Sequence, residues 1–344
     1  MKTRSWIWQF DTDYPGVEPD DSKLPIGEVF VKTHDGVSYM SAFCDHPATP
    51  KNAASVAHLN SVYANQGIMF SPWCVPKGLN PAAEAAIAIE VIRAGSNRLI
   101  LDVEPYQYFW TGPWANLHPY MQMIRAACPD AWISLSCDPR YGTYGHYTVD
   151  HLAEIHIDEW LPYINCLVPQ DYWNTFDTDP VWEVEHTWER LKDYGKTIIF
   201  ALPGHDDDPV RFQRGLERAT QLAGAQDPMG WGGTSIWRRG ETRRANWDAI
   251  TQVDPGVLIE TCEQKLAKQS EELLATYGRL RGASDQIANL QRLMDAANEQ
   301  VARLQATADA RLGRIRGMES KVGNQTVKLQ EVIKSLSVGI PYSD

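Results

Sequence analysis

Apolar and β-branched residues gather in eight short runs within the first 255 residues, and helix-length segments separate most of these runs. Two such segments, 81–95 and 181–195, close on a glycine, as many helices do. Eight strands with helices between them match the count and length of a (β/α)8 TIM barrel. A doubly wound open sheet is the rival, but it would more often carry a glycine-rich phosphate loop after the first strand. The predicted strands span 5–10, 28–34, 67–75, 98–104, 131–138, 166–173, 197–204 and 233–239, and only the first crossover, 11–27, reads as a polar loop.

The last part of the chain carries a different pattern, with an apolar residue at every seventh position. Counted from Ile259, this heptad position a stays apolar as far as Leu336, and position d is apolar at most of its occurrences. A surface helix follows a 3.6-residue period and drifts out of such a frame, so the pattern predicts a coiled coil. We expect a stalk over 256–340 that forms a parallel homo-oligomer, with a trimer favoured over a dimer. A helix folded back along the barrel or into a hairpin is the alternative.

Composition changes at the same point in the chain. All 13 tryptophans lie at or before Trp247, and 20 of the 21 prolines lie at or before Pro255. We therefore predict a barrel domain over 1–255, the α-helical coiled-coil stalk over 256–340 and a short tail at 341–344. The net charge is -12, and because 256–344 holds 12 basic and 11 acidic residues, the barrel carries -13. This acidity argues against a nucleic-acid partner.

Three further features bound the class of protein. No run of about twenty apolar residues is present, so no membrane span is expected. The first residues, "MKTRSWIWQFDTDYPG", lack the apolar core of a secretory signal, so no signal peptide is expected. The six cysteines are scattered without a C-x-x-C pair, which favours reduced thiols over disulfides or metal ligands. The motifs imply neither a cofactor nor a bound metal.

The run "LILDVEPY" (99–106) carries two carboxylates where a buried strand ends. Asp102 and Glu104 are two residues apart, so both side chains point to the same face, into the mouth of the barrel. Two carboxylates this close in a partly desolvated site cannot both ionise freely, which leaves a protonated acid beside a charged base. Protonation of a glycosidic oxygen requires such an acid. The alternatives are a structural ion pair with Arg98 or Arg140, or a divalent-cation site.

The other strand ends add aromatic, amide and charged side chains. Carboxylates beside Trp and Tyr are typical of sugar sites, where aromatic planes stack on the C–H faces of the rings. Asp residues in "GHDDDP" (204–209) are interpreted as helix caps or substrate contacts in preference to metal ligands. The candidate substrate-binding residues are His34, Trp73, Asp138, Gln170, Asp171, Trp173, His205, Trp237 and Arg238.

Three strand ends together resemble the glycoside-hydrolase barrels of chitinases and D-x-E lysozymes: "LILDVE" on the fourth strand, "VPQDYW" on the sixth and "GGTSIW" on the eighth. The resemblance covers about residues 1–250. It implies that Glu104 is the general acid, that Asp102 is its partner, that Tyr172 orients the substrate and that Trp237 forms the floor of the sugar site. This chain departs from the chitinase pattern in its shortened D-x-E motif and in Asp171, which precedes Tyr172 instead of following it.

We expect a glycosidase that acts on a cell-surface amino-sugar polymer, similar to peptidoglycan, and that is carried on the stalk. A barrel on an oligomeric stalk also resembles bacteriophage tail-tip and fibre proteins. This favours a virion-associated protein with other tail proteins as possible partners, and otherwise a cytoplasmic one. The alternative function is an inactive structural or glycan-binding virion protein.

Overall fold

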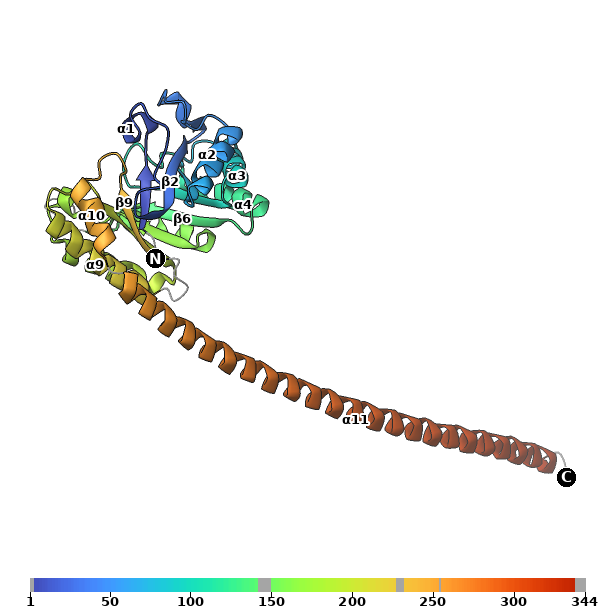
Figure 1. Cartoon of the computed structure of the whole chain (residues 1–344). Coiled ribbons are helices and arrows are strands. Elements are labelled where there is room, and N and C mark those ends of the chain that lie inside the picture. Colours follow the sequence, from blue (N-terminus) through green and yellow to red (C-terminus); the bar gives the residue numbers. More distant parts are fainter. Residues whose placement is uncertain (1–2, 142–149, 227–231, 254, 338–344) are drawn as a thin grey trace, which may run out of the picture. The chain divides into compact units, whose positions relative to one another are not determined.

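The computed structural model describes residues 3–141, 150–226, 232–253 and 255–337. The chain divides into two compact units, Met1–Leu266 and Ala267–Asp344. The first unit contains the barrel and the second most of one long helix (Figure 1).

Eight parallel strands form a closed barrel, as the sequence predicts. Each strand pairs with the next one around the barrel, and β1 pairs with both β9 and β2, which closes the sheet. A two-residue strand, β3 (Ser38–Tyr39), adds an antiparallel hairpin to the end of β2. The barrel strands are β1 (Thr3–Ile7), β2 (Ile26–Asp35), β4 (Met69–Val75), β5 (Arg98–Asp102), β6 (Trp132–Cys137), β7 (Cys166–Pro169), β8 (Thr197–Pro203) and β9 (Gly233–Trp237).

Helices fill the crossovers between strands, and their first residues carry strong start signals. The Asn80 side chain accepts from the Ala83 N–H, and Pro81 occupies the first turn of its helix. The first crossover, expected as a polar loop, contains the one-turn helix α1 (Phe10–Asp13). The other α-helices are α2 (Ala53–Asn65), α3 (Pro81–Ala94), α4 (Leu117–Ala127), α5 (His151–Glu154), α6 (Ile157–Trp160), α7 (Trp173–Phe176), α8 (Pro180–Leu191), α9 (Pro209–Gln226), α10 (Arg244–Gln252) and α11 (Pro255–Ser337); 3₁₀ turns occupy Met40–Ala42, Trp114–Asn116, Leu161–Tyr163 and Lys192–Tyr194.

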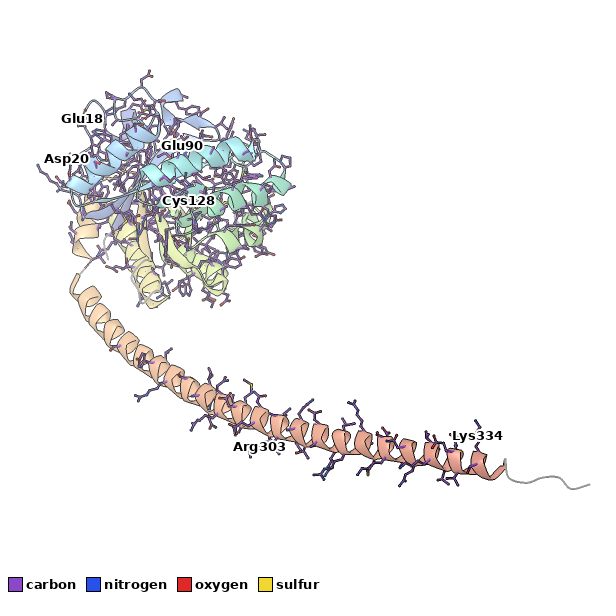
Figure 2. All side chains as sticks on the ribbon, turned by 90° about the vertical axis from the view of Figure 1, so that its right-hand side faces the viewer. Glu18, Asp20, Glu90, Cys128, Arg303 and Lys334 are labelled. Carbon is purple, nitrogen blue, oxygen red and sulfur yellow. The ribbon has the colours of Figure 1, made fainter. Side chains whose placement is uncertain are left out.

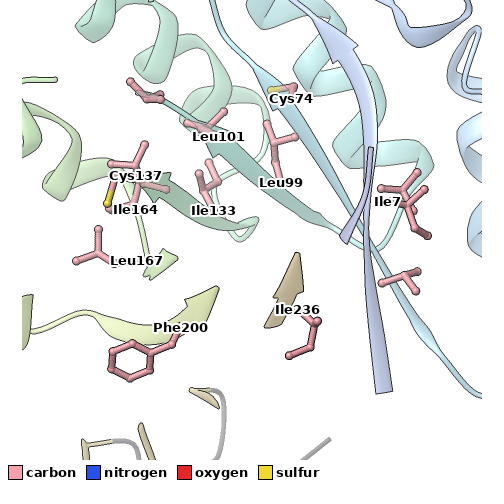
Figure 3. Packing of buried hydrophobic residues seen from close by; sticks show 14 of the residues in the cluster. Ile7, Cys74, Leu99, Leu101, Ile133, Cys137, Ile164, Leu167, Phe200 and Ile236 are labelled. Carbon is pink, nitrogen blue, oxygen red and sulfur yellow. The ribbon is translucent and has the colours of Figure 1, made fainter. Parts of the chain in front are cut away.

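The hydrophobic core has two layers, and the alternation of side chains along each strand assigns residues to one or the other. On β5, Leu99 and Leu101 point outward and pack beneath the helices, in the cluster drawn in Figure 3. Ile100 points inward and packs inside the barrel with Trp6 and Trp73. Asp102 continues this inward face beyond Ile100. The strand therefore directs its last side chain into the barrel mouth.

The long helix α11 spans 83 residues, or about 125 Å at 1.5 Å per residue. From residue 286 to residue 335 every side chain is exposed, and Figure 2 shows these side chains, Arg303 and Lys334 among them, along the helix. Over residues 286–335, the apolar side chains of the helix are therefore not covered by other described parts of the chain. Among the described residues, no helix is long and apolar enough to cross a membrane.

Candidate active site

A pocket of about 250 Å³ lies at the carboxyl ends of β5, β6, β7 and β9, the end of the barrel where (β/α)8 enzymes carry their active sites. Carboxylates, an amide and a guanidinium meet aromatic rings in its wall. The lining residues are Asp102, Glu104, Tyr106, Asp138, Arg140, Gln170, Tyr172, Thr175, Phe176 and Trp237.

Asp102 and Glu104 both face this pocket and share one hydrogen-bond donor. The Nε2 amide of Gln170 lies 2.7 Å from Glu104 Oε1 and 3.2 Å from Asp102 Oδ1. It also lies 3.3 Å from the Ser136 hydroxyl. Gln170 follows β7, so a residue from a neighbouring strand holds the two carboxylates of the β5 end in place. Of the two arginines considered in the sequence, Arg98 contacts Glu28 and Arg140 contacts Asp138. The charge of Arg140 also lowers the pKa of Glu104.

The two carboxylates differ in how readily they ionise. Burial raises the pKa of Asp102 to about 6, against the hydrogen bonds from Ser136 and Gln170 that lower it. Burial also raises the pKa of Glu104, and the negative charge of Asp102 raises it further, to well above its usual range. At neutral pH the pair therefore favours a protonated Glu104 beside an ionised Asp102, which is the combination of a proton donor and a base.

The carboxylate of Asp138, at the end of β6, contacts three other side chains. Its carboxylate lies 2.9 Å from both the Tyr106 hydroxyl and Nδ1 of His151, and it accepts from the Arg140 guanidinium. Burial opposes ionisation of Asp138, but the hydrogen bonds from His151 and Arg140 outweigh it and hold the pKa below its usual range. Arg140 in turn lies with its Cζ 3.8 Å from the ring centroid of Phe176. Asp138 and Arg140 therefore place an ion pair in the wall of the pocket.

Aromatic rings form another part of the pocket lining. Trp237 is half-buried, and its ring packs edge-on against Trp6 and Trp73 at centroid distances of 5.8 and 6.1 Å. Tyr172 lies 6.2 Å from Trp237, and burial raises the pKa of its hydroxyl, which keeps it protonated. The peptide bond between Trp237 and Arg238 is cis. Trp237 also lines the pocket, so part of its side chain faces the space that is open to a ligand.

Asp171 and Trp173, two predicted substrate contacts next to Gln170 and Tyr172, point away from the pocket. Asp171 is fully buried behind the strand, where it accepts from the Thr187 hydroxyl, and Trp173 is buried with its indole N–H donating to Asp206. Alternation along the chain sends residues 170 and 172 into the pocket and 171 and 173 away from it. The prediction that Asp171 and Trp173 contact substrate therefore does not fit the structure.

His34 and Trp73 are also too deeply buried to contact a substrate. Trp73 is 1% exposed, lies in the layer beneath Trp237, and donates to the Ile7 carbonyl. His34 is 1% exposed with its Nδ1 2.9 Å from the Thr33 hydroxyl. Burial lowers the pKa of His34 to about 3, so its ring is neutral. Both predictions are corrected: these residues belong to the interior.

His205 and Arg238 lie near the barrel mouth but outside the lining of the pocket. Arg238 contacts Asp13, Glu241 and Thr12, which connects the loop after β9 to helix α1. His205 is half-buried in the turn after β8. In the same turn, Asp208 accepts from the N–H groups of Val210 and Arg211 and so caps α9.

The sequence reasoning missed four residues of the pocket: Tyr106, Arg140, Thr175 and Phe176. Tyr106 and Arg140 each follow an acidic strand-end residue by two positions, a spacing that places them on the same face, and this signal could have found them. Within the part of the chain that the structure describes, no three His, Cys, Asp or Glu residues are grouped as metal ligands.

The structure is similar to several carbohydrate-active barrels of low sequence identity. A GH18 chitinase from Pseudoalteromonas aurantia matches 74% of this chain and 100% of its own, at 17% identity and a TM-score of 0.48. The endo-beta-1,4-mannanase from Thermotoga petrophila matches 73% and 76%, at 9% identity and a TM-score of 0.48. The spore cortex-lytic enzyme SleL of Bacillus megaterium QM B1551 matches 73% of both chains, at 11% identity and a TM-score of 0.44. Comparison with family models and with curated proteins found no match.

Proposed function

We propose that the barrel is a glycoside hydrolase that cleaves an amino-sugar polymer of the peptidoglycan or chitin type. The observation that carries this proposal is the carboxylate pair of Asp102 and Glu104, held by one amide in a pocket with an aromatic floor. Glycoside hydrolysis needs a protonated carboxylic acid at the leaving oxygen and a second group that stabilises the developing positive charge. The pair supplies both at neutral pH.

Gln170 also indicates which oxygen of Glu104 would deliver the proton. Its amide N–H donates to Oε1 at 2.7 Å, which suits a carbonyl-type acceptor. The proton of the neutral acid then resides on Oε2. In the proposed reaction, Oε2–H of Glu104 passes its proton to the glycosidic oxygen as the C–O bond breaks, and ionised Asp102 stabilises the positive charge that develops on the sugar. A water molecule then adds to the sugar carbon and returns a proton to Glu104. Tyr172 and the exposed face of Trp237 hold the sugar ring.

The choice of an amino-sugar polymer rests on the resemblance of the three strand ends to chitinase and D-x-E lysozyme barrels. The pocket has a volume of about 250 Å³, so we expect it to hold a short part of a sugar chain that continues across the barrel mouth. We further propose that the protein is displayed on a phage particle, with the long helix as its stalk. Immunogold labelling of purified particles with antibody against the barrel checks this; unlabelled particles whose lysate contains the protein would contradict it.

The decisive experiment compares the full-length protein with its Glu104→Gln variant. Wild-type protein should clear suspensions of purified cell walls or release reducing ends from chito-oligosaccharides, and Glu104→Gln should lower the rate at least a hundredfold, because general acid catalysis contributes about 10²–10⁴-fold. Glu18→Gln, which makes the same chemical change at an exposed position, is the matched control and should keep full activity. Equal rates in Glu104→Gln and wild type would remove Glu104 from the acid role. Glycan binding by the wild type without cleavage would leave a binding protein.

A further inference from the structure

The long helix α11 presents an apolar stripe that nothing in its own unit covers. Between residues 286 and 335, the large apolar residues at heptad positions a and d are each between 47% and 66% exposed. Large apolar side chains at this density on one face indicate an interaction surface. The stripe consists of Ile287, Leu290, Met294, Val301, Leu304, Ile315, Met318, Val322, Leu329 and Val332.

The spacing of the stripe selects the kind of partner. Positions a and d recur every 3.5 residues on average, so the stripe stays in line only along another helix with the same period. A globular partner has no such repeat, whereas a second copy of this chain has it by construction. Five glycines of the helix lie at positions b, c and f, and a Cβ added at any of them would meet open space. These positions face away from the stripe, so the glycines do not leave gaps in a seam.

Charges on the flanks of the stripe select the relative orientation of the copies. Between residues 286 and 335 the charged residues at position g are all basic: Arg314, Lys321 and Lys328. The charged residue at position e is the acidic Glu319. Parallel helices bring g of one chain against e of the next heptad of its neighbour, and antiparallel helices bring g against g. Parallel, in-register order therefore places Arg314 against Glu319. Antiparallel order that overlaps the segments 314–328 would place basic residues against one another.

Flanking apolar residues favour more than two helices. Leu293 at position g, and Leu312 and Ile333 at position e, are between 51% and 61% exposed. They widen the stripe beyond the two positions that a helix pair covers, and a third helix would bury more of this added surface. The polar seam residue Arg311 lowers the stability of any such bundle, because like charges would meet near its axis.

We propose that α11 associates with copies of itself as a parallel, in-register bundle of three helices, in which Arg314 of each chain pairs with Glu319 of its neighbour. The two residues are five positions apart, too far round the helix to pair within one chain. Within one chain, Arg303 pairs with Glu299, and both lie on the outer face of the helix. The bundle does not depend on the proposed hydrolase activity.

Sedimentation equilibrium of the full-length chain at micromolar concentration tests the assembly. A trimer is expected; a monomer overturns the proposal, and a dimer overturns the bundle of three. The double variant Leu290→Asp with Leu304→Asp should be monomeric, because each buried carboxylate would lack a partner. The matched control adds the same charges at the outer position b, as Ala288→Asp with Ala302→Asp, and should remain a trimer. If both double variants stay trimeric, the chain associates through another surface.

A charge exchange and a cross-link test the pairing and the orientation. Arg314→Glu alone and Glu319→Arg alone should each weaken association several-fold, and the double exchange should restore it; a double exchange no better than either single variant overturns the pairing. In a Cys262→Ser background, Met318→Cys should form a disulfide between chains, because parallel in-register helices bring position 318 of neighbours together at the seam. Absence of this cross-link in an otherwise trimeric protein overturns the parallel order.

Discussion

Replacement of Asp102 by asparagine should stabilise the barrel at neutral pH and leave it unchanged in acid. Asp102 is 6% exposed, and its burial raises its pKa from 3.8 to about 6. A carboxyl group with a raised pKa in the folded state contributes fully to stability below the pKa of the unfolded chain. That contribution is lost as the pH rises through the folded pKa. Wild-type protein should therefore lose stability between about pH 4 and pH 6, and a neutral side chain should not.

The size of the effect follows from the change in pKa. A difference of about two pH units corresponds to about 3 kcal/mol, because one unit is worth about 1.4 kcal/mol. We expect Asp102→Asn to gain up to about 3 kcal/mol at pH 8, or roughly 6–12 °C in melting temperature for a domain of this size. Asparagine is isosteric with aspartate, and its oxygen can accept from Gln170 as Asp102 does. The Ser136 hydroxyl can donate or accept, so it tolerates the new amide.

Unfolding by urea, followed by tryptophan fluorescence at several values of pH, measures this effect. All 13 tryptophans lie in the first 247 residues, so the signal reports on the barrel and not on the stalk. Asp138→Asn is the control of opposite sign, since it breaks the buried contact with Arg140 and should cost about 3–5 kcal/mol. An Asp102→Asn variant that is no more stable than wild type at pH 8, or whose advantage is the same at pH 4, would refute the raised pKa of Asp102 as the cause.

Two further changes test how the pocket operates. Gln170→Leu removes the donor that lowers the pKa of both carboxylates. NMR titration should therefore show a higher pKa for Asp102 and for Glu104, and an unchanged titration would contradict the shared amide. Trp237→Ala should weaken the binding of chito-oligosaccharides at least tenfold by calorimetry, whereas Trp237→Phe keeps an aromatic face and should lose less; equal affinities in all three proteins would exclude Trp237 from the floor.

The barrel and its strands could be predicted from the sequence because each strand is a short run of apolar residues between turns and helices. The sequence also predicted that Asp102, Glu104, Gln170 and Tyr172 lie at the same end of the barrel. This prediction needs only the order of the strands and the face of the sheet to which each side chain points. The run 166–173 was interpreted as one strand, although β7 ends at Pro169. Its side chains were collected without separating the two faces, and for this reason Asp171 and Trp173 were wrongly expected in the site.

Other parts of the site depend on contacts that no local pattern records. His34 has the same parity as the inward residue Phe30, but the pairing of β2 with β4 shifts register between Lys32 and His34, and the ring is buried beside Thr33. Trp73 does point inward, yet Trp237 lies above it. The burial of His34 follows from one irregularity in strand register, and the burial of Trp73 follows from its depth inside the barrel. The pattern of residues along the chain records neither.

The barrel and the stalk differ in how much of their function is encoded locally. The apolar stripe on α11 repeats the same heptad pattern many times. A single polar residue in it, such as Arg311, therefore does not hide the pattern. The pocket uses each residue once, and its chemistry depends on a 2.7 Å contact between Gln170 and Glu104, residues 66 positions apart in the chain. Alternation places both side chains on the inner face, but only the closed barrel brings them within hydrogen-bond distance. For that reason the proposed partner of the helix rests on the sequence pattern, whereas the hydrogen bond from Gln170 to Glu104 was found only in the structure.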